Sequence, residues 1–256
     1  MPQARLYVGT SGWSYPHWAG GRFYPRGLKP GDWLAYLSQH FATVEVNSTF
    51  YRLPSDTTVR RWRTVTSPGF RFAVKLWRMI THQKKLADCD DLLRDFFSVA
   101  DGFGAKRGPL LVQLPPSLHK DLQRLDAFLV RLRAAMRRRH WRVAVEFRHQ
   151  SWDDAETRAL LDTHHAAACL ADMERCPFTS ANDVDFVYVR RHGPGGRYRG
   201  CYSGQQIAAD AAQVRAWLAA GKDVYVYYNN DVGGHAVDNA RQLLAACGQD
   251  PSPAGS

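Results

Sequence analysis

The chain has 256 residues, of which 45% are hydrophobic, and a formal net charge of +10. That length and apolar content suffice for one large domain. No apolar run reaches the ~18 residues that a membrane span needs. The segment Met1–Arg5 lacks the apolar stretch of a secretion signal. The five cysteines are scattered and form no CxxC, which indicates reduced thiols. We therefore expect a cytoplasmic protein with no membrane contact.

Eight segments have the composition and alternation of β-strands: Leu6–Gly9, Thr43–Asn47, Phe70–Lys75, Leu110–Leu114, Val143–Phe147, Ala167–Ala171, Phe186–Arg190 and Val224–Tyr228. Helical patterns fill most gaps between them: Asp32–His40, Thr57–Thr66, Asp90–Gly102, Leu122–Arg139, Asp153–His164, Gln205–Ala220 and His235–Ala246. Between Asp172 and Asp185, Pro177 and several turn formers predict a degenerate sixth helix.

Strands that alternate with helices predict a parallel sheet, and eight such units predict a TIM-type (β/α)8 barrel. We expect one α/β barrel domain over residues 1–247 and a disordered polar tail over residues 248–256. An open doubly wound sheet is the alternative fold, but no GxGxxG follows the first strand.

Alternation within the second strand places Val44 and Val46 on one face and Glu45 and Asn47 on the other. Taking the polar-ended face of each strand as the barrel side collects one set of residues: Glu45, Asn47, Lys75, Gln113, Glu146, Arg148, Asp172, Arg190 and Asn229. These positions lie at or near the C-terminal ends of strands, where such barrels carry chemistry.

The polar set contains three acids and three bases, so it could be a neutral internal ion network. A purely structural core would use Val, Ile and Leu at these positions. Because polar groups that converge on a concave site mark function, we favour a functional pocket.

The loops expected above this face mix aromatic residues with cations. Trp13 lies in an acid-free loop after the first strand, His82 lies after the third strand, and His192 lies after the seventh. Such loops can stack bases and neutralise phosphates. The same aromatic residues could instead stack on sugar rings or close the barrel mouth.

The loop after the eighth strand has the sequence N-N-D-V-G-G-H and contains Asn230, Asp231, Gly233 and Gly234. Free N–H groups at a helix N-terminus bind anions, and barrel phosphate sites use the loops after strands seven and eight. A plain glycine turn with no ligand is the alternative.

Several side chains could supply ligands to a divalent metal: Glu45, Glu146, Asp172, Asp231, His149 and His192. No HExxH or comparable spacing is present, so the sequence leaves the cofactor open.

Six arginines lie at or beyond the C-terminal half of one expected helix: Arg131, Arg133, Arg137, Arg138, Arg139 and Arg142. Cations there complement the helix dipole, and blocks of like charge are more often solvated faces than binding sites. We expect these arginines to lie away from the pocket.

Long motifs in the chain resemble the YecE-like family, domain-of-unknown-function family 72. The segments that carry the resemblance are G-T-S-G-W (9–13), V-E-V-N-S-T-F-Y (44–51), Q-L-P-P-S (113–117), V-E-F-R-H-Q-S-W (145–152) and Y-Y-N-N-D-V-G-G-H-A (227–236). The resemblance implies a TIM-type barrel and no particular reaction. The zinc cage of the similarly folded endonuclease IV has no residue-by-residue counterpart in this sequence.

The leading hypothesis is a barrel that binds a phosphorylated small molecule or nucleic acid at its C-terminal face and hydrolyses a phosphoester. Glu45 and Glu146 would be the acid–base pair, with Asp172 and His149 as further catalytic candidates. Cations would stabilise the anion: Lys75, Arg148, Arg190 and His192. Further ligand contacts would come from Trp13, Asn47, His82, Gln113, Asn229, Asn230, Asp231, Gly233 and Gly234.

Two rival functions remain open at this stage. One is a carbohydrate-acting enzyme that uses the same two carboxylates, and the other is a nucleic-acid-binding module without turnover. The sequence does not indicate an oligomeric state.

Overall fold

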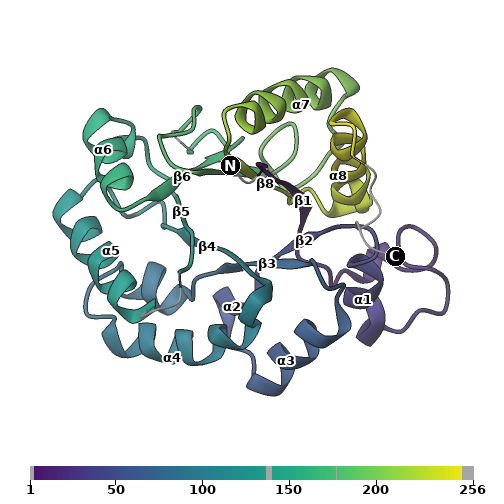
Figure 1. The fold of residues 1–256 in the computed structure, drawn as a ribbon, viewed down its shortest axis with the longest axis horizontal. Coiled ribbons are helices and arrows are strands. Elements are labelled where there is room, and N and C mark those ends of the chain that lie inside the picture. Colours follow the sequence, from purple (N-terminus) through teal and green to yellow (C-terminus); the bar gives the residue numbers. More distant parts are fainter. Residues whose placement is uncertain (1–2, 137–139, 177, 250–256) are drawn as a thin grey trace.

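The computed structural model describes residues 3–136, 140–176 and 178–249. Eight parallel strands close into a barrel in chain order, and β8 pairs with β1 (Figure 1). The strands are β1 (Leu6–Ser11), β2 (Thr43–Val46), β3 (Arg71–Lys75), β4 (Arg107–Gln113), β5 (Val143–Glu146), β6 (Ala166–Ala171), β7 (Phe186–Arg191) and β8 (Asp223–Tyr228). The TIM-type barrel expected from the sequence is confirmed.

Helices surround the barrel on its outer side (Figure 1). They are α1 (Trp33–Leu37), α2 (Ser48–Tyr51), α3 (Asp56–Val65), α4 (Asp90–Ala100), α5 (Leu122–Met136), α6 (Ala155–Thr163), α7 (Gly204–Ala219) and α8 (His235–Ala246). Short 3₁₀ or π turns cover Pro16–Trp18, Pro30–Asp32, Met79–Gln83, Asp101–Lys106, Gln150–Trp152 and Val232–Gly234. In the described ranges, no helix combines the length and apolar character needed to cross a bilayer.

The largest departure from a regular barrel follows β6. Among the described residues 172–176 and 178–185 no helix forms, which agrees with the expected degenerate helix. The buried side chain of Asn182 ties this segment to the barrel, because its Oδ1 accepts from the N–H of Ala168 at 2.8 Å. Its Nδ2 also donates to the carbonyl of Ala166 at 3.1 Å.

Three helices begin where side chains satisfy free backbone donors. Ser203 and Gln206 form a capping box at α7, Asp154 accepts from the N–H of Thr157 at 2.8 Å at α6, and Ser55 caps α3. Such caps typically contribute about 1 kcal/mol each. They explain why three expected helices begin within two residues of their predicted starts.

The buried apolar side chains form two clusters. One lies between the strands and the helices and includes Val44, Val46 and Val74. The other consists mainly of side chains that fill the barrel: Tyr7, Ala73, Leu111, Ala144, Ala167, Cys169, Val184, Phe186, Tyr188, Tyr225 and Tyr227. On most strands, these inward apolar residues and the polar residues named from the sequence occupy alternate positions on the same face. The polar residues therefore also point into the barrel, nearer its C-terminal end.

Candidate functional site

Glu45 lies fully buried inside the barrel on β2 and is held by a bidentate arginine contact. Nε and Nη2 of Arg190 donate to its two carboxylate oxygens at 3.0 and 2.8 Å. The hydroxyls of Ser11 and Tyr188 donate at 2.8 and 2.7 Å. Since a carboxylate offers about four acceptor sites, these four donors leave Glu45 with no free one.

Glu146, at the end of β5, accepts from the same arginine. Nη1 of Arg190 donates to its Oε2 at 2.7 Å, and Arg148 forms an ion pair with its Oε1. Burial works to raise the pKa of Glu146, but the charges of Arg148 and Arg190 outweigh it and lower the pKa well below the usual range. We call Glu45, Glu146, Arg148 and Arg190 the carboxylate network, in which two acids match two permanent cations.

A cavity of about 280 Å³ lies at the C-terminal strand ends beside this network. Its lining is Tyr15, Asn47, Tyr51, Lys75, Gln113, Arg190, Tyr198 and Asn229. Glu45 and Glu146 are fully buried and are not part of that lining. The cavity therefore presents cations, amides and phenols to a ligand, while the two acids lie beneath them.

Lys75 is the cation of this cavity that no acid neutralises. Among the described residues it forms no ion pair, and its Nζ lies 4.1 Å from the centre of the Phe50 ring. Burial, followed by the charge of Arg190, lowers the pKa of Lys75 to about 7. The amine can therefore gain or lose its proton near neutral pH.

His192 follows β7 and is fully buried beside the network. Its Nδ1 accepts from the amide of Asn229 at 3.2 Å, and its Nε2 lies 3.9 Å from Glu146 without a hydrogen-bond partner in the described part of the chain. Burial and the charge of Arg190 lower the pKa of His192 to about 2. The imidazole is thus neutral at physiological pH and cannot supply the positive charge expected from the sequence.

Asp172 follows β6 and holds the loop after β7. Its Oδ1 accepts from the N–H of His192 at 2.6 Å, and its Oδ2 accepts from the hydroxyl of Tyr202. Burial raises the pKa of Asp172. These contacts orient the backbone that carries His192, and Asp172 itself does not line the cavity.

The histidines His149 and His82 lie outside the carboxylate network. His149 accepts from the N–H of Ser151 at 3.1 Å and stacks on His119 with 3.8 Å between ring centres. His82 packs edge-on against Phe50, and burial together with the charge of Lys75 lowers its pKa to about 4. His149 therefore caps a turn, whereas the neutral imidazole of His82 packs on Phe50 close to Lys75.

Trp13 and Asn230 serve packing in this structure. Trp13 meets Trp62 edge-on with 5.1 Å between ring centres. Asn230 is fully buried and donates to the carbonyl of Gly200 and to Asn239, both within 2.9 Å. Neither side chain lines the cavity.

The loop after β8 does not contribute to the cavity lining beyond Asn229. The N–H of Gly234 donates to the carbonyl of Asp231 at 2.8 Å. Arg22 packs over Gly234 and donates to the carbonyl of Gly233 at 2.7 Å. The two glycines have φ angles of +77° and +78° and form a turn against which Arg22 packs. This geometry agrees with a plain glycine turn, the alternative to an anion site given above.

The sequence prediction missed five residues that contact Glu45 or line the cavity: Ser11, Tyr15, Tyr51, Tyr188 and Tyr198. Tyr188 shares strand parity with Arg190, so the alternation that identified the arginine could also have identified it. Ser11 escaped because β1 extends two residues past its expected end.

Metal ligation has little support among these side chains. The described residues contain no cluster of three or more His, Cys, Asp or Glu side chains that could hold a metal ion. Glu45 and Glu146, two of the possible ligands named from the sequence, face Arg190.

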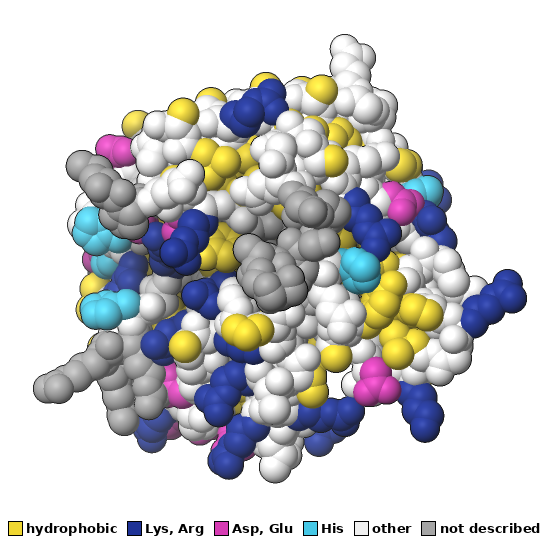
Figure 2. Space-filling model, turned by 45° about the vertical axis from the view of Figure 1, so that its right-hand side comes forward, with side chains coloured by type: hydrophobic (Ala, Val, Ile, Leu, Met, Phe, Trp, Pro, Cys, Tyr) yellow, Lys and Arg dark blue, Asp and Glu magenta, His cyan; other side chains and the backbone are white. Residues whose placement is uncertain are grey.

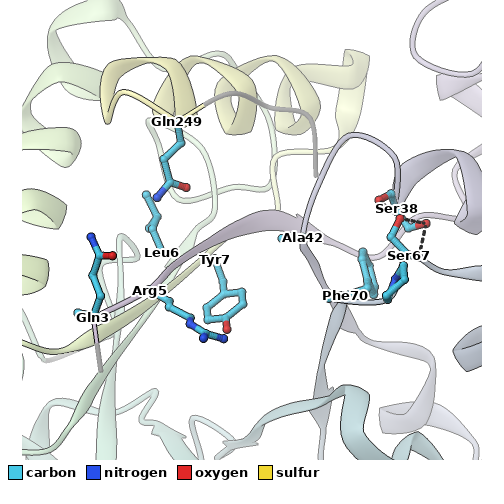
Figure 3. A pocket seen from close by; sticks show the side chains of 12 residues that line it. Gln3, Arg5, Leu6, Tyr7, Ser38, Ala42, Ser67, Phe70 and Gln249 are labelled. Carbon is cyan, nitrogen blue, oxygen red and sulfur yellow. Dashed lines mark hydrogen bonds between the residues drawn. The ribbon is translucent and has the colours of Figure 1, made fainter. Parts of the chain in front are cut away.

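A second cavity of about 490 Å³ lies at the opposite end of the barrel (Figure 3). It is larger, and its walls come from the starts of β1 and β3 and from Ser38, Ala42 and Gln249. Arg5 is the one charged residue among those that line it. We place the functional site at the C-terminal end, because the titratable groups converge there and barrel enzymes use that end.

Arg133 and Arg142 lie at this opposite end. Arg142 precedes β5 and donates to Asp223 and Asp185 at 2.5 and 2.7 Å. Arg133 donates to the carbonyl of Trp141 at 3.2 Å. Residues 137–139 of the same sequence run lie outside the described residues, and so do residues 250–256 of the expected tail.

The family profile described as "Protein of unknown function DUF72" matches residues 7–255. The chain belongs to this family. It is 36% identical over 110 residues to the UPF0759 protein YecE of Escherichia coli K12, a match that covers 43% of this chain and only 38% of YecE. It is 26% identical to the UPF0759 protein YunF of Bacillus subtilis, with 93% of each chain covered.

Solved DUF72 structures agree with the barrel. A DUF72 family protein of Thermotoga maritima superposes with a TM-score of 0.81 at 28% identity, covering 96% of this chain and 100% of that one. SacUVDE superposes with a TM-score of 0.62 at 8% identity over 96% and 99% of the two chains, which shows a shared fold alone.

Proposed function

We propose that this DUF72 chain binds a phosphate-bearing ligand, a phosphorylated small molecule or a nucleic-acid terminus, in the cavity at the C-terminal barrel end. The observation that carries the proposal is the charge arrangement. Lys75 reaches the cavity without an acidic partner, while Glu45 and Glu146 are buried and matched to guanidinium groups. An anion placed there meets positive charge in a partly enclosed site, where charge interactions are stronger than in bulk water.

The loops around the cavity extend the positive charge to the surface. The stretches 47–54, 76–85 and 192–203 follow β2, β3 and β7 and contain no acid. They carry exposed cations at Arg52, Arg78, Lys84, Arg197 and Arg199. Such a rim would attract a phosphate group and orient it toward Lys75.

The remaining lining groups suit the rest of such a ligand. Asn47, Gln113 and Asn229 offer amide donors and acceptors, and the Oδ1 of Asn47 lacks a protein partner among the described residues. Tyr51 is 66% exposed and offers a ring face for stacking on a base or a sugar.

Hydrolysis by the two carboxylates is less well supported than binding. A glycosidase or a phosphoesterase of that type needs a carboxylate with a free oxygen beside its substrate. In this structure Glu45 is saturated with donors, and Arg148 and Arg190 hold Glu146. We therefore place binding before hydrolysis in this proposal.

Calorimetric titration with sulfate tests the proposal, because sulfate mimics phosphate and keeps its charge across neutral pH. We expect Lys75→Met to weaken sulfate binding about tenfold or more, which corresponds to ~1.4 kcal/mol. Lys29→Met removes an exposed lysine outside the loops of that rim and should change it little. Equal affinity of wild type and Lys75→Met would overturn the proposal.

A short 5′-phosphorylated oligonucleotide then distinguishes the ligand classes. Displacement of sulfate with a steep salt dependence would favour nucleic acid. Displacement by mononucleotides or sugar phosphates alone would favour a small ligand.

A further inference from the structure

Lys75 differs from every other lysine of the chain. The sequence holds seven lysines among its 34 basic residues. Lys106, Lys120 and Lys222 donate to carbonyl or carboxylate oxygens, and the others are exposed or half-buried at the surface: Lys29, Lys84 and Lys85. Lys75 is buried and borders the cavity.

Thr49 contacts the backbone of Lys75, and the Phe50 ring contacts its amine. It is the last residue of β3, and its carbonyl accepts from the hydroxyl of Thr49 at 2.7 Å. The Phe50 ring lies 4.1 Å from Nζ on one side. Lys75 is buried and belongs to the cavity lining, so its nitrogen lies beside the space that a bound group would occupy.

The choice of lysine over arginine at this position matters chemically. Arginine stays protonated at every physiological pH, whereas a lysine desolvated beside another cation can lose its proton. Burial and Arg190 act on Lys75 in this way and bring its pKa to about 7. A large fraction of the amine is therefore unprotonated at neutral pH and carries a free electron pair.

We propose that Lys75 forms an imine with the carbonyl group of a small phosphorylated aldehyde or ketone bound in the cavity. The neutral amine adds to the carbonyl carbon, a C–N bond forms, and the carbonyl electron pair moves to oxygen. That oxygen takes up a proton as nitrogen releases one. The resulting hydroxyl takes up one further proton from solvent and leaves as water while the nitrogen electron pair closes the C=N bond, which gives a protonated imine; nothing is oxidised or reduced.

This inference rests on the proposed function, because anion binding is what would hold the phosphorylated substrate. Phosphate binding and imine formation by Lys75 are compatible in charge. A protonated imine is still a cation, so the phosphate keeps a positive partner after the bond has formed. Asn47, Gln113 and Asn229 line the same cavity and can donate to the departing oxygen.

Reductive trapping tests the inference on the wild-type protein. The chain is incubated with glyceraldehyde 3-phosphate, borohydride reduces any imine to a stable secondary amine, and peptide mass mapping locates the adduct. We expect Lys75 to be labelled roughly tenfold or more above exposed Lys29, because Lys75 lines the cavity that binds the phosphate and its pKa of about 7 leaves much of its amine neutral at pH 7. Unphosphorylated glyceraldehyde should label Lys75 less.

Variants and sulfate binding separate the outcomes. Lys75→Arg should remove the dominant adduct while keeping sulfate binding, and Lys29→Arg, at an exposed lysine outside the rim, should leave the Lys75 adduct unchanged. A wild-type protein that binds sulfate but is labelled evenly over its surface lysines would overturn the imine and spare the proposed function. Absence of both sulfate binding and Lys75 labelling would overturn both.

Discussion

At the level of single residues, Arg190 determines how the barrel acids behave. It contacts Glu45 through two nitrogens and Glu146 through the third, and all three side chains are almost fully excluded from water. Desolvated charges are tolerated when they are paired and become costly when one partner is removed. The carboxylate network is therefore a structural requirement of the barrel interior as well as the floor of the proposed site.

Replacement of Glu45 by alanine should destabilise the protein, since Arg190 would lose two hydrogen bonds and one of its counter-charges. We expect a loss of about 3–5 kcal/mol in the free energy of unfolding, measured by urea denaturation. Glu174→Ala, which removes an exposed carboxylate, is the control and should have little effect. A change below about 1 kcal/mol for Glu45→Ala would show that the network contributes little to stability.

The protonation of Lys75 makes sulfate affinity depend on pH. Its pKa of about 7 lies below the ordinary value of 10.5, so the ammonium that attracts sulfate is present below about pH 7 and is lost above it. Affinity should fall as pH rises from about 6 to about 9.

Lys75→Arg should bind sulfate with little pH dependence over the same range, because the guanidinium stays charged. The other charged or titratable groups around Lys75 are Glu45, Glu146, Arg148, Arg190, His82, His192, Tyr15, Tyr51 and Tyr198. The pKa values of His82 and His192 are about 4 and about 2, so neither ring titrates in this window. An identical pH dependence in wild type and Lys75→Arg would contradict the role of Lys75.

At the level of elements, alternation along the strands predicted much of the site. Glu45, Lys75, Gln113, Glu146 and Arg190 point inward as expected, because a strand exposes every second residue to the same side. The pairing among them was not predictable, since it depends on strand register and on contacts across the barrel. The loop residues that line the cavity were harder to predict than the strand residues. Turns determine their positions, and turns have no repeating pattern in the sequence.

Gly9 on β1 lies close against the backbone of β2. A Cβ atom added at Gly9 would lie 2.1 Å from the carbonyl oxygen of Thr43, which is backbone and cannot rotate away. Gly9→Ala should therefore push β1 and β2 apart and lower the free energy of unfolding by about 1–3 kcal/mol or more. Gly69→Ala meets no atom within 4 Å and is the matched control. Equal stability of the two variants would contradict this packing.

At the level of the whole molecule, the chain carries a formal net charge of +10. Figure 2 shows Lys and Arg side chains scattered over the visible face, with fewer acidic side chains between them. Arg133 and Arg142 lie at the end of the barrel opposite the cavity and bond to carbonyls or acids there. Net charge alone therefore does not locate the ligand.

Replacement of Arg137, Arg138 and Arg139 by glutamine should leave sulfate affinity nearly unchanged, although it removes three of the 34 basic residues. The sequence predicts this run away from the pocket, and salt screens charges that lie more than ~10 Å apart. The paired replacement of Arg52 and Arg78, which lie on the loops at the C-terminal strand ends, should weaken oligonucleotide binding. A large loss in the triple variant, measured by the same calorimetry, would mean that the arginine run takes part in binding.

The most direct test of the proposed site is a crystal structure of the protein soaked with selenate, whose selenium atom is located by anomalous scattering. We expect a selenate ion in the cavity lined by Lys75, Asn47 and Gln113, with an oxygen within hydrogen-bond distance of the Lys75 amine. The carboxylate network should keep its pairing beneath it. Selenate bound only at surface arginines or in the cavity at the opposite barrel end, with the Lys75 cavity free of anion, would contradict the proposed function.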